Sequence, residues 1–486
     1  VAEFTSDGNR NVLDRAEMPV SLGRDVFTTG IISRETQALC LHVLSRYKEQ
    51  LAGWGIVPSN TTVIATSAFR EAKNKDPVMD KILSSTGFRV TVIDGIEENR
   101  LMYMAVTDIV KFGSEDTVIL EVGGGSTEMM LMKKGRMVGA HSLRLGTVRL
   151  ESKMKSSAEP LTDVRSYIEE YTAETKGSIE SEIDFSEVQR FIAVGSDATL
   201  VAINAGKPIS TFLWSIDRAA FDSFVDEIQE YSVDECVARF KISYNDAQAM
   251  HVSLLIYKMF IHMTNVQTII VPETNIRDGL IVNKLGEPSE ELKDEFFQQI
   301  KASAMSLLRK YHGDEEHAER VRWYSLKFYE ALFGGTVDED RSRLLLELAA
   351  ILHDIGIFIR MDEHNLHSEY IIRHSEIFGI THTENVILSI IAKYHRGKAQ
   401  PQDNEQFQIL SRSDRMKILK LTAILRVSDA LDRGHGKTFE DFSVEINGDS
   451  LIVRTKGSKN VALERLALKE KDSLFESVFG YKLILV

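Results

Sequence analysis

The chain has 486 residues, 43% hydrophobic and 27% charged, and its 58 Lys and Arg against 72 Asp and Glu give a net charge of −14. This globular composition excludes a disordered, collagen-like or coiled-coil chain and has room for roughly two to four domains. The acidic balance disfavours nucleic-acid binding, although a local basic groove remains open, because salt screens charges beyond about 8 Å.

Cysteine content and hydropathy indicate the cellular compartment of the protein. Only two cysteines occur, Cys40 and Cys236, so we expect no disulfide framework and no Cys-rich zinc site, as in a reducing compartment. No apolar run reaches the ~18 residues of a membrane span, and no signal peptide is visible. We predict a cytoplasmic protein without a membrane span, and leave peripheral association with a membrane open.

The first half of the chain alternates strand and helix patterns, which indicates an α/β architecture. Strand, turn and strand open the chain, and a helical pattern over 33–55 follows. Further strand patterns occupy 61–69, 88–94, 117–122, 190–194 and 265–274, helices follow at 96–110 and 195–203, and 128–143 is typical of a hairpin turning at Lys133-Lys134-Gly135.

The second half changes character at about Ser289, where long amphipathic helical patterns begin and continue to about Asp432. Asn447-Gly448 then separates two alternating runs over 442–455, a strong hairpin signal. We therefore predict α/β lobes over 1–116 and 117–288, an all-α domain over 289–438 and a small α+β domain over 439–486.

Residues 121–128 (EVGGGSTE) form the most informative segment and end an apolar strand pattern. Three consecutive glycines allow a tight turn that directs several N–H groups to one point, which suits phosphate oxygens. Ser126 and Thr127 add hydroxyl groups. The terminal residues Glu121 and Glu128 suit a phosphate-bound Mg²⁺, which prefers oxygen ligands. An ordinary turn with solvated carboxylates is the alternative.

Two other segments place polar groups where strands end. Gly195 and Ser196 begin a second glycine turn, and Arg70 closes a run of small and hydroxyl residues over 65–70. Arginine suits bidentate phosphate recognition, and open α/β sheets bind ligands at the carboxyl ends of their strands. Taken alone, Arg70 is better explained as a surface charge that opens a helix, and the glutamates of 95–100 as compensation of a helix dipole.

Six motifs in this order resemble the exopolyphosphatase / guanosine pentaphosphate phosphohydrolase family: TSAFREAKN (66–74), GIEENRLMY (95–103), LEVGGGSTE (120–128), SLRLGTVRL (142–150), VGSDATL (194–200) and IRDGL (276–280). The resemblance implies two ribonuclease-H-like lobes of the actin / sugar kinase / Hsp70 superfamily. It also implies Mg²⁺-dependent hydrolysis of a phosphoanhydride in inorganic polyphosphate or guanosine pentaphosphate, the latter giving the tetraphosphate of the stringent response. For long members it implies a homodimer.

The resemblance also assigns roles to residues. Glu98 matches the general base that activates the attacking water, and Glu128 matches an acidic residue that holds the metal or the water. The cleft Mg²⁺ is assigned to Glu121 and Glu128. Phosphate binding is assigned to Arg70, Gly123, Gly124, Gly125, Ser126, Thr127, Gly195 and Ser196.

Two departures from the family pattern stand out. The glycine loop usually begins with Asp, and here Glu121 extends the carboxylate by one methylene. The family's first phosphate loop, Asp-x-Gly-(Ser/Thr)-Asn-Ser, is missing before a chain that starts at Val1. We expect truncation by about a strand and a loop; an impaired, divergent member is the alternative.

The helical region carries a second signature, His317, then His353-Asp354, then Asp429. This order resembles the HD-domain phosphohydrolases, and implies a divalent metal held by these four side chains, a ligand set that suits such an ion. A relic of that fold without metal is the alternative. His364, His367 and His395 are expected either to line the same cavity or to serve as packing residues.

These observations are compatible with several functions. We expect exopolyphosphatase activity first, with guanosine pentaphosphate hydrolysis as the alternative substrate choice. An HD-type nucleotide phosphohydrolase and a non-catalytic regulator that binds polyphosphate or the alarmone remain open. A sugar kinase of the same superfamily fits less well, because a water-activating base at Glu98 does not serve transfer to an alcohol.

Overall fold

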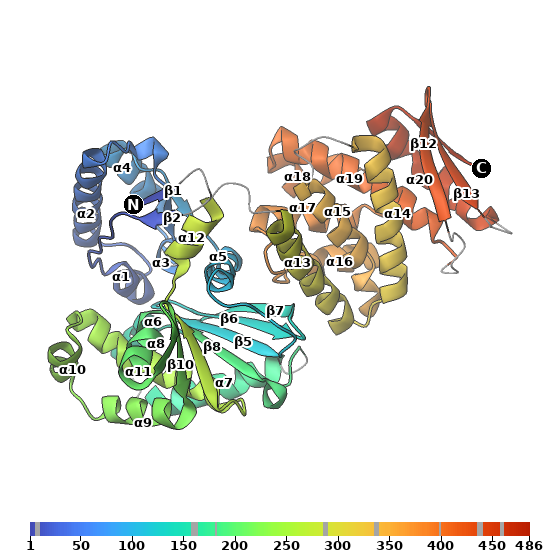
Figure 1. Cartoon of the computed structure of the whole chain (residues 1–486). Coiled ribbons are helices and arrows are strands. Elements are labelled where there is room, and N and C mark those ends of the chain that lie inside the picture. Colours follow the sequence, from blue (N-terminus) through green and yellow to red (C-terminus); the bar gives the residue numbers. More distant parts are fainter. Residues whose placement is uncertain are drawn as a thin grey trace. The chain divides into compact units, whose positions relative to one another are not determined.

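The computed structural model describes residues 1–4, 10–156, 164–179, 182–284, 290–334, 340–397, 400–434, 441–456 and 461–486. The chain folds into two compact units, residues 1–293 and 294–486 (Figure 1). The finer division into four domains stays a prediction. Both cysteines are free and buried. Among the described residues, no helix combines the length and apolarity needed to cross a membrane.

The first part of unit 1 contains two small sheets surrounded by helices. An antiparallel pair joins β1 and β2, and a parallel pair joins β3 and β4. The strands are β1 (Ala2–Phe4), β2 (Arg10–Val12), β3 (Val63–Ala65) and β4 (Val90–Val92), and the helices are α1 (Leu22–Thr29), α2 (Arg34–Gly53), α3 (Ser67–Glu71), α4 (Lys75–Thr86) and α5 (Gly95–Thr107).

The strands expected at 61–69 and 88–94 are each only three residues long. The chain turns into α3 at Ser67, which buries the Phe69 ring against the core around Ile82 and Phe88. Because β1 and β2 pair with each other and β3 pairs only with β4, the described residues of this part form no larger sheet. In these residues the first lobe, which was expected without its first strand and phosphate loop, contains two separate two-stranded sheets.

A seven-stranded sheet forms the centre of the second part, in the order β7-β6-β5-β8-β11-β10-β9. β5, β8 and β11 are parallel, and the other neighbours are antiparallel. The strands are β5 (Thr117–Val122), β6 (Thr127–Lys133), β7 (Arg136–Leu143), β8 (Arg190–Val194), β9 (Lys207–Ser210), β10 (Leu213–Asp217) and β11 (Thr268–Pro272). This mixed α/β fold with a large sheet confirms the expected class.

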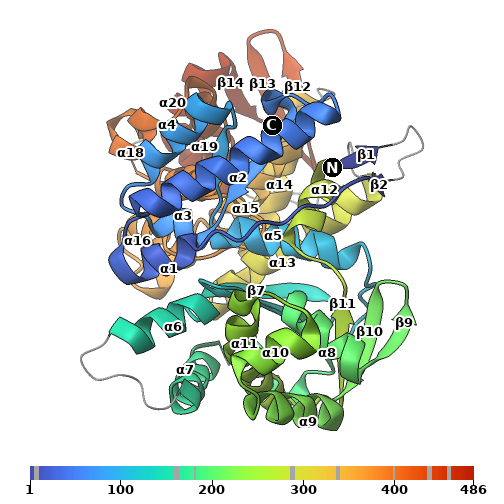
Figure 2. The same ribbon diagram turned by 90° about the vertical axis from the view of Figure 1, so that its left-hand side faces the viewer.

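Helices cover both sides of this sheet (Figures 1 and 2). α8, α9 and α11 pack on its strands, while α5 from the first part packs on β6 and β7, and α12 returns to pack on α5. The contact between α5 and β6 is important, because these elements carry Glu98 and Glu128. The helices are α6 (Thr147–Ser156), α7 (Val164–Ile179), α8 (Ser196–Ala205), α9 (Arg218–Gln229), α10 (Val233–Phe240), α11 (Tyr244–His262) and α12 (Ile276–Lys284).

Unit 2 is a helical bundle with a small sheet packed on it. α19 and α20 pack together, and Phe442 of the sheet lies among the rings of Trp323, Tyr324 and Phe328. The helices are α13 (Glu290–Lys310), α14 (Glu315–Phe333), α15 (Asp340–Leu352), α16 (His364–Arg373), α17 (His382–Lys393), α18 (Glu405–Ile409), α19 (Arg412–Leu431) and α20 (Ala462–Phe479).

The small sheet has the order β12-β13-β14, with β12 (Asp441–Asn447), β13 (Ser450–Lys456) and β14 (Lys482–Leu485). β12 and β13 form an antiparallel hairpin, and Gly448 in its turn has a φ of +58°. This left-handed conformation favours glycine, and it confirms the hairpin predicted from Asn447-Gly448.

Candidate active site

The glycine-rich loop begins where the buried strand β5 ends. Glu121 on β5 is directly opposite Glu128 on β6 in the antiparallel register. Residues that face each other in such a pair project from the same side of the sheet, with Cβ atoms about 4.5–5.5 Å apart. The fold therefore brings the two carboxylates that flank the loop together, as the predicted metal site requires.

Hydrogen bonds to α6 hold the loop in place. The carbonyl of Gly124 accepts from the N–H groups of Val148 (2.9 Å) and Arg149 (3.1 Å), and the carbonyl of Gly125 accepts from Arg149 Nε at 2.7 Å. Arg149 is itself paired with Glu71 and stacked on the Phe27 ring. The loop carbonyls therefore point toward α6.

Glu98 is positioned by the start of α5. The helix begins at Gly95 and is capped by the preceding Asp94, whose carboxylate accepts from the N–H of Glu97 at 2.9 Å. Arg70 Nη1 donates to Glu98 Oε1 at 2.7 Å and to the carbonyl of Ile93 at 2.7 Å. The predicted base and the predicted phosphate-binding arginine thus form one partly buried ion pair.

Glu128 is held by two polar partners that sequence reasoning did not assign to the site. Asn99 Nδ2 donates to Glu128 Oε2 at 3.0 Å, and Ser142 Oγ donates to Oε1 at 2.8 Å. Gly95 permits this arrangement, because a Cβ there would lie 2.5 Å from Ser142 and 3.6 Å from Glu128 Oε2. Asn99 is the residue after Glu98, and its spacing alone gave no sign that it reaches the strand.

We call Glu98, Glu121 and Glu128 the acidic site. Burial raises the pKa values of all three carboxylates. Burial raises the pKa of Glu128 to about 8 and that of Glu121 to about 7, and in both the charge of Glu98 adds to the effect. Burial also raises the pKa of Glu98, which the Arg70 guanidinium opposes. The three groups therefore share one electrostatic environment.

A divalent cation fits this environment. Three oxygen-bearing groups that repel one another are stabilised by a hard cation, and Mg²⁺ takes carboxylate oxygens together with substrate phosphates. Glu121 and Glu128 are the residues that would hold it, with the glycine loop beside them.

The second glycine turn lies next to the first, because β5 and β8 are parallel neighbours with Glu121 opposite Val194. Gly195 has a φ of +119°, and a Cβ there would lie 3.3 Å from the hydroxyl of Tyr257. That hydroxyl contacts the carbonyl of Val194 and accepts from the N–H of Val122 at 3.0 Å, so it joins the two strand ends. Nothing in the sequence pattern pointed to Tyr257.

The hydroxyl residues predicted to bind phosphate, Ser126, Thr127 and Ser196, occupy different environments. Ser196 begins α8, and its neighbour Asp197 has a pKa raised to about 6 by burial. Ser126 is buried beside Glu128, whose pKa it lowers by hydrogen bonding. Thr127 is also buried, and its hydroxyl donates to the carbonyl of Leu145 at 2.5 Å, so it supports the turn.

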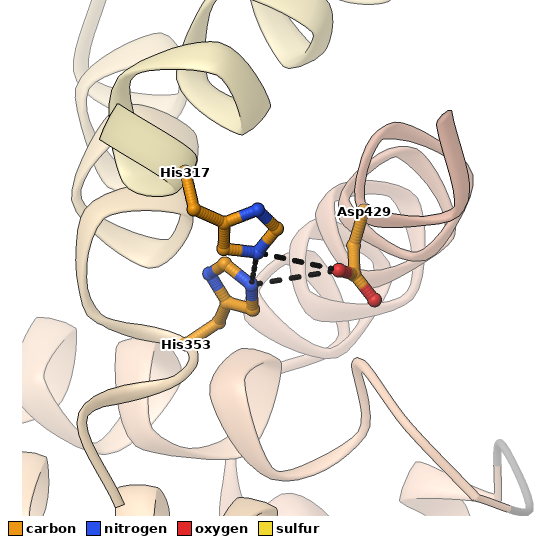
Figure 3. A group of neighbouring side chains, drawn as sticks. All are labelled: His317, His353 and Asp429. Atoms are coloured by element: carbon orange, nitrogen blue, oxygen red, sulfur yellow. Dashed lines mark hydrogen bonds and ion pairs between the residues drawn. The ribbon is translucent and has the colours of Figure 1, made fainter. Parts of the chain in front are cut away.

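The side chains of the histidine and aspartate signature lie close together in unit 2. His317 on α14, His353 at the end of α15 and Asp429 on α19 point toward one another (Figure 3). The Nε2 atoms of the two histidines are 3.2 Å apart, and Asp429 Oδ1 lies 3.6 Å from that of His317 and 3.7 Å from that of His353. Asp354, the fourth residue of the predicted set, is also close, because its Oδ2 lies 3.6 Å from His317 Nε2. All four predicted residues therefore lie together.

Two of the three uncertain histidines join this group, and both are buried. His364 Nε2 and His395 Nε2 lie 3.0 and 3.3 Å from Asp354 Oδ1. We call His317, His353, Asp354, His364, His395 and Asp429 the histidine–aspartate cluster. The sequence signature indicated the convergence of His317, His353, Asp354 and Asp429, but it left His364 and His395 undecided.

Two family patterns together match nearly the whole chain. The Ppx/GppA phosphatase family pattern matches residues 3–287, and that of Ppx/GppA phosphatase, domain III, matches 300–475. A guanosine-5'-triphosphate,3'-diphosphate pyrophosphatase of Vibrio atlanticus is 23% identical over 90% of this chain and 86% of its own length. One of the same name from Pseudoalteromonas atlantica is 23% identical over 86% and 82%.

The fold has a counterpart among solved structures. An exopolyphosphatase from Cytophaga hutchinsonii has a TM-score of 0.52 and 20% identity, over 58% of this chain and 92% of its own. That likeness concerns the fold alone. From the match over residues 3–287, the chain belongs to the Ppx/GppA phosphatase family, whose members hydrolyse phosphoanhydride bonds.

Proposed function

We propose that the acidic site removes the terminal phosphate of inorganic polyphosphate, with Glu98 as general base and Mg²⁺ as cofactor. The observation that supports this most is the placement of Glu98. It is paired with Arg70 at 2.7 Å, and its charge raises the pKa values of the two glutamates that flank the glycine loop. A base, a cation and a phosphate loop then serve one reaction.

The proposed reaction is an in-line displacement. A water oxygen bonds to the terminal phosphorus, the bond to the bridging oxygen breaks, and Glu98 accepts the proton of the water. The shortened chain leaves with the bridging oxygen, and orthophosphate is released. Mg²⁺ bound at Glu121 and Glu128 would neutralise charge on the phosphate oxygens, and Arg70 would add a fixed positive charge beside them.

Guanosine pentaphosphate is the second candidate substrate. Two relatives that match 90% and 86% of this chain carry names specifying hydrolysis of the guanosine compound, which supports this choice. The reaction is the same at the phosphorus, so the acidic site serves either substrate. A homodimer, and a regulator without turnover, remain further proposals.

The test measures orthophosphate release with Mg²⁺ from long-chain polyphosphate and from guanosine pentaphosphate in parallel. Glu98→Gln keeps the shape of the side chain and removes the base, so we expect a loss of about 10²–10⁴-fold in rate. Glu97→Gln is the matched control: Glu97 is on the same helical turn and pairs with Arg100 instead. We expect near wild-type rates from it.

The ratio of the two wild-type rates selects the substrate. Faster release from polyphosphate supports the proposal, and faster release from guanosine pentaphosphate selects the second candidate. Equal rates for Glu98→Gln and wild type would reject Glu98 as the base, and no release from either substrate would favour the regulator.

A further inference from the structure

The side chain of Tyr257 links the two glycine turns beside the acidic site. Tyr257 lies on α11, which packs on β5 and α8, and it is only 1% exposed. Its hydroxyl contacts the carbonyl of Val194 and lies 3.0 Å from the backbone nitrogen of Val122. Val122 immediately precedes Gly123, and Val194 immediately precedes Gly195. One side-chain group therefore touches the residue before each turn.

The hydroxyl bridges two strands at the point where their pairing ends. The parallel pairing of β5 with β8 begins with Thr117 opposite Arg190 and ends with Glu121 opposite Val194. The N–H of Val122 and the carbonyl of Val194 lie at that end, and both contact the Tyr257 hydroxyl. A side chain from α11 therefore fixes the spacing of the two strand ends.

We propose that Tyr257 is a positioning residue of the acidic site, whose hydroxyl sets the place of Glu121 and of the glycine loop for metal binding. This inference rests on the proposed function of that site. We assign Tyr257 no contact with the substrate. It acts through the backbone of Val122, the residue directly after Glu121.

The chemistry of the two contacts fixes the orientation of the hydroxyl. A backbone carbonyl only accepts, so the hydroxyl donates its proton to Val194 and accepts from the N–H of Val122. Both functions of the hydroxyl are used. A phenylalanine ring would occupy the same space, but it would leave this buried N–H and this carbonyl without their common partner, and such a loss is costly. The site therefore depends on the hydroxyl and not only on the ring.

The start of the glycine loop is held from two sides. The N–H of Gly123 donates to the carbonyl of Ser126 at 2.9 Å, which closes the loop onto itself. The N–H of Val122, one residue earlier, is held by Tyr257. Successive residues of a strand direct their backbone groups to opposite sides, so neither hydrogen bond can replace the other. Loss of the hydroxyl would release one side of the loop.

Glu121 lies close to the same hydroxyl. A Cβ built on Gly195 would lie 3.3 Å from the hydroxyl oxygen of Tyr257 and 4.0 Å from Glu121 Cγ. A shift of the end of β5 would therefore move the Glu121 carboxylate relative to Glu128 on β6. Mg²⁺ demands near-ideal octahedral geometry, so its affinity is sensitive to such a shift.

Hydrogen–deuterium exchange tests the proposal without turnover. The full-length protein is titrated with Mg²⁺, and exchange is followed by mass spectrometry in peptides that cover residues 117–129. We expect this segment to exchange faster in Tyr257→Phe than in the wild type. We also expect half-maximal protection to require a Mg²⁺ concentration about 10-fold higher. The readout is local to the acidic site.

Tyr231→Phe is the matched control. The Tyr231 hydroxyl is also hydrogen-bonded, but its partners are Glu227 on α9 and Arg239 on α10, at the surface. This variant removes the same chemical group without touching a strand end. We expect wild-type exchange over residues 117–129 and a wild-type Mg²⁺ midpoint.

Phosphate release separates positioning from simple destabilisation. A variant that is only less stable has fewer active molecules, which lowers the maximal rate but leaves the Mg²⁺ concentration for half-maximal rate unchanged. For Tyr257→Phe, we expect that concentration to rise about 10-fold. We expect the maximal rate at saturating Mg²⁺ to fall less than in Glu98→Gln.

A wild-type Mg²⁺ midpoint in folded Tyr257→Phe, by exchange or by phosphate release, overturns the proposal, as does a wild type that Mg²⁺ does not protect over residues 117–129. Failure of the proposed function is a different result: Glu98→Gln then releases phosphate as fast as the wild type, or neither releases any, and the exchange midpoint still decides the role of Tyr257. Circular dichroism establishes folding. If Tyr257→Phe fails to fold, 4-fluorophenylalanine in place of Tyr257 carries the same expectation, because fluorine fills the space of the hydroxyl and donates no hydrogen bond.

Discussion

A single ion pair, between Arg70 and Glu98, sets the protonation of the proposed base. Burial raises the pKa of Glu98, and the guanidinium 2.7 Å away opposes that shift. The base acts only when ionised, so Arg70→Met, which removes the cation, raises the pKa further. We predict that the acidic limb of kcat/KM against pH moves to higher pH; a limb at the wild-type position would contradict this.

The other two glutamates link stability to pH. The pKa values are about 7 for Glu121 and about 8 for Glu128, against 4.5 as the ordinary value, so the folded protein binds more protons than the unfolded chain between those limits. Their contribution to the free energy of unfolding is therefore favourable at low pH and is lost as pH rises through this window.

The check is urea unfolding in chelator between pH 5 and 8. We expect the wild type to lose stability as pH rises, and Glu128→Gln, which cannot ionise, to lose less. Mg²⁺ should restore stability at pH 8 in the wild type, because it neutralises the carboxylates. An equal slope in both proteins would show that Glu128 does not titrate in this range.

At the scale of elements, the glycine loop fits against α3 and α1 with no spare room. A Cβ on Gly125 would collide with Ser67 on α3 and lie 2.6 Å from the Phe27 ring on α1. We predict that Gly125→Ala costs about 1–3 kcal/mol of stability and displaces the loop, lowering phosphate release. The control is Gly177→Ala in α7, where nothing lies within 4 Å. A Gly125→Ala protein with wild-type stability and rate would contradict the argument.

The elements also show what the sequence could predict. Apolar runs and turn residues were sufficient for β5, for the β6–β7 hairpin with its turn at Lys134-Gly135, and for β12–β13. They overestimated β3, because α3 takes up Ser67–Glu71, and they overestimated β4, which covers only Val90–Val92. They missed β9 and β10. All four residues of β9 are exposed, so this strand has no alternation of buried and exposed residues.

The site residues could also be predicted only in part. Glu121 and Glu128 were found because they flank the glycine loop, whereas Glu98 was assigned only by the resemblance to the family, since its own segment indicated no more than compensation of a helix dipole. Asn99, Ser142 and Tyr257 were missed because they reach the site through packing of α5, β7 and α11, which no local pattern encodes. His364 and His395 were left undecided for the same reason.

For the whole molecule, two compact units with different ligand sets predict two responses to metals. A bound ion stabilises the unit that holds it, by about 2.7 kcal/mol when its concentration is 100 times the dissociation constant. In calorimetry of the full chain, we expect Mg²⁺ to raise one transition and Co²⁺ to raise another. His395→Gln should weaken only the cobalt response. A single transition raised equally by both ions would contradict two separate sites.

The central claim is that phosphoanhydride hydrolysis occurs at the acidic site of unit 1 and not at the histidine–aspartate cluster of unit 2. The most direct measurement compares Mg²⁺-dependent phosphate release from polyphosphate and guanosine pentaphosphate by the wild type, Glu98→Gln and Asp354→Asn. The account predicts that Glu98→Gln loses about 10²-fold or more and that Asp354→Asn stays near wild type. Release that survives Glu98→Gln and disappears in Asp354→Asn would contradict it and move the chemistry to the cluster.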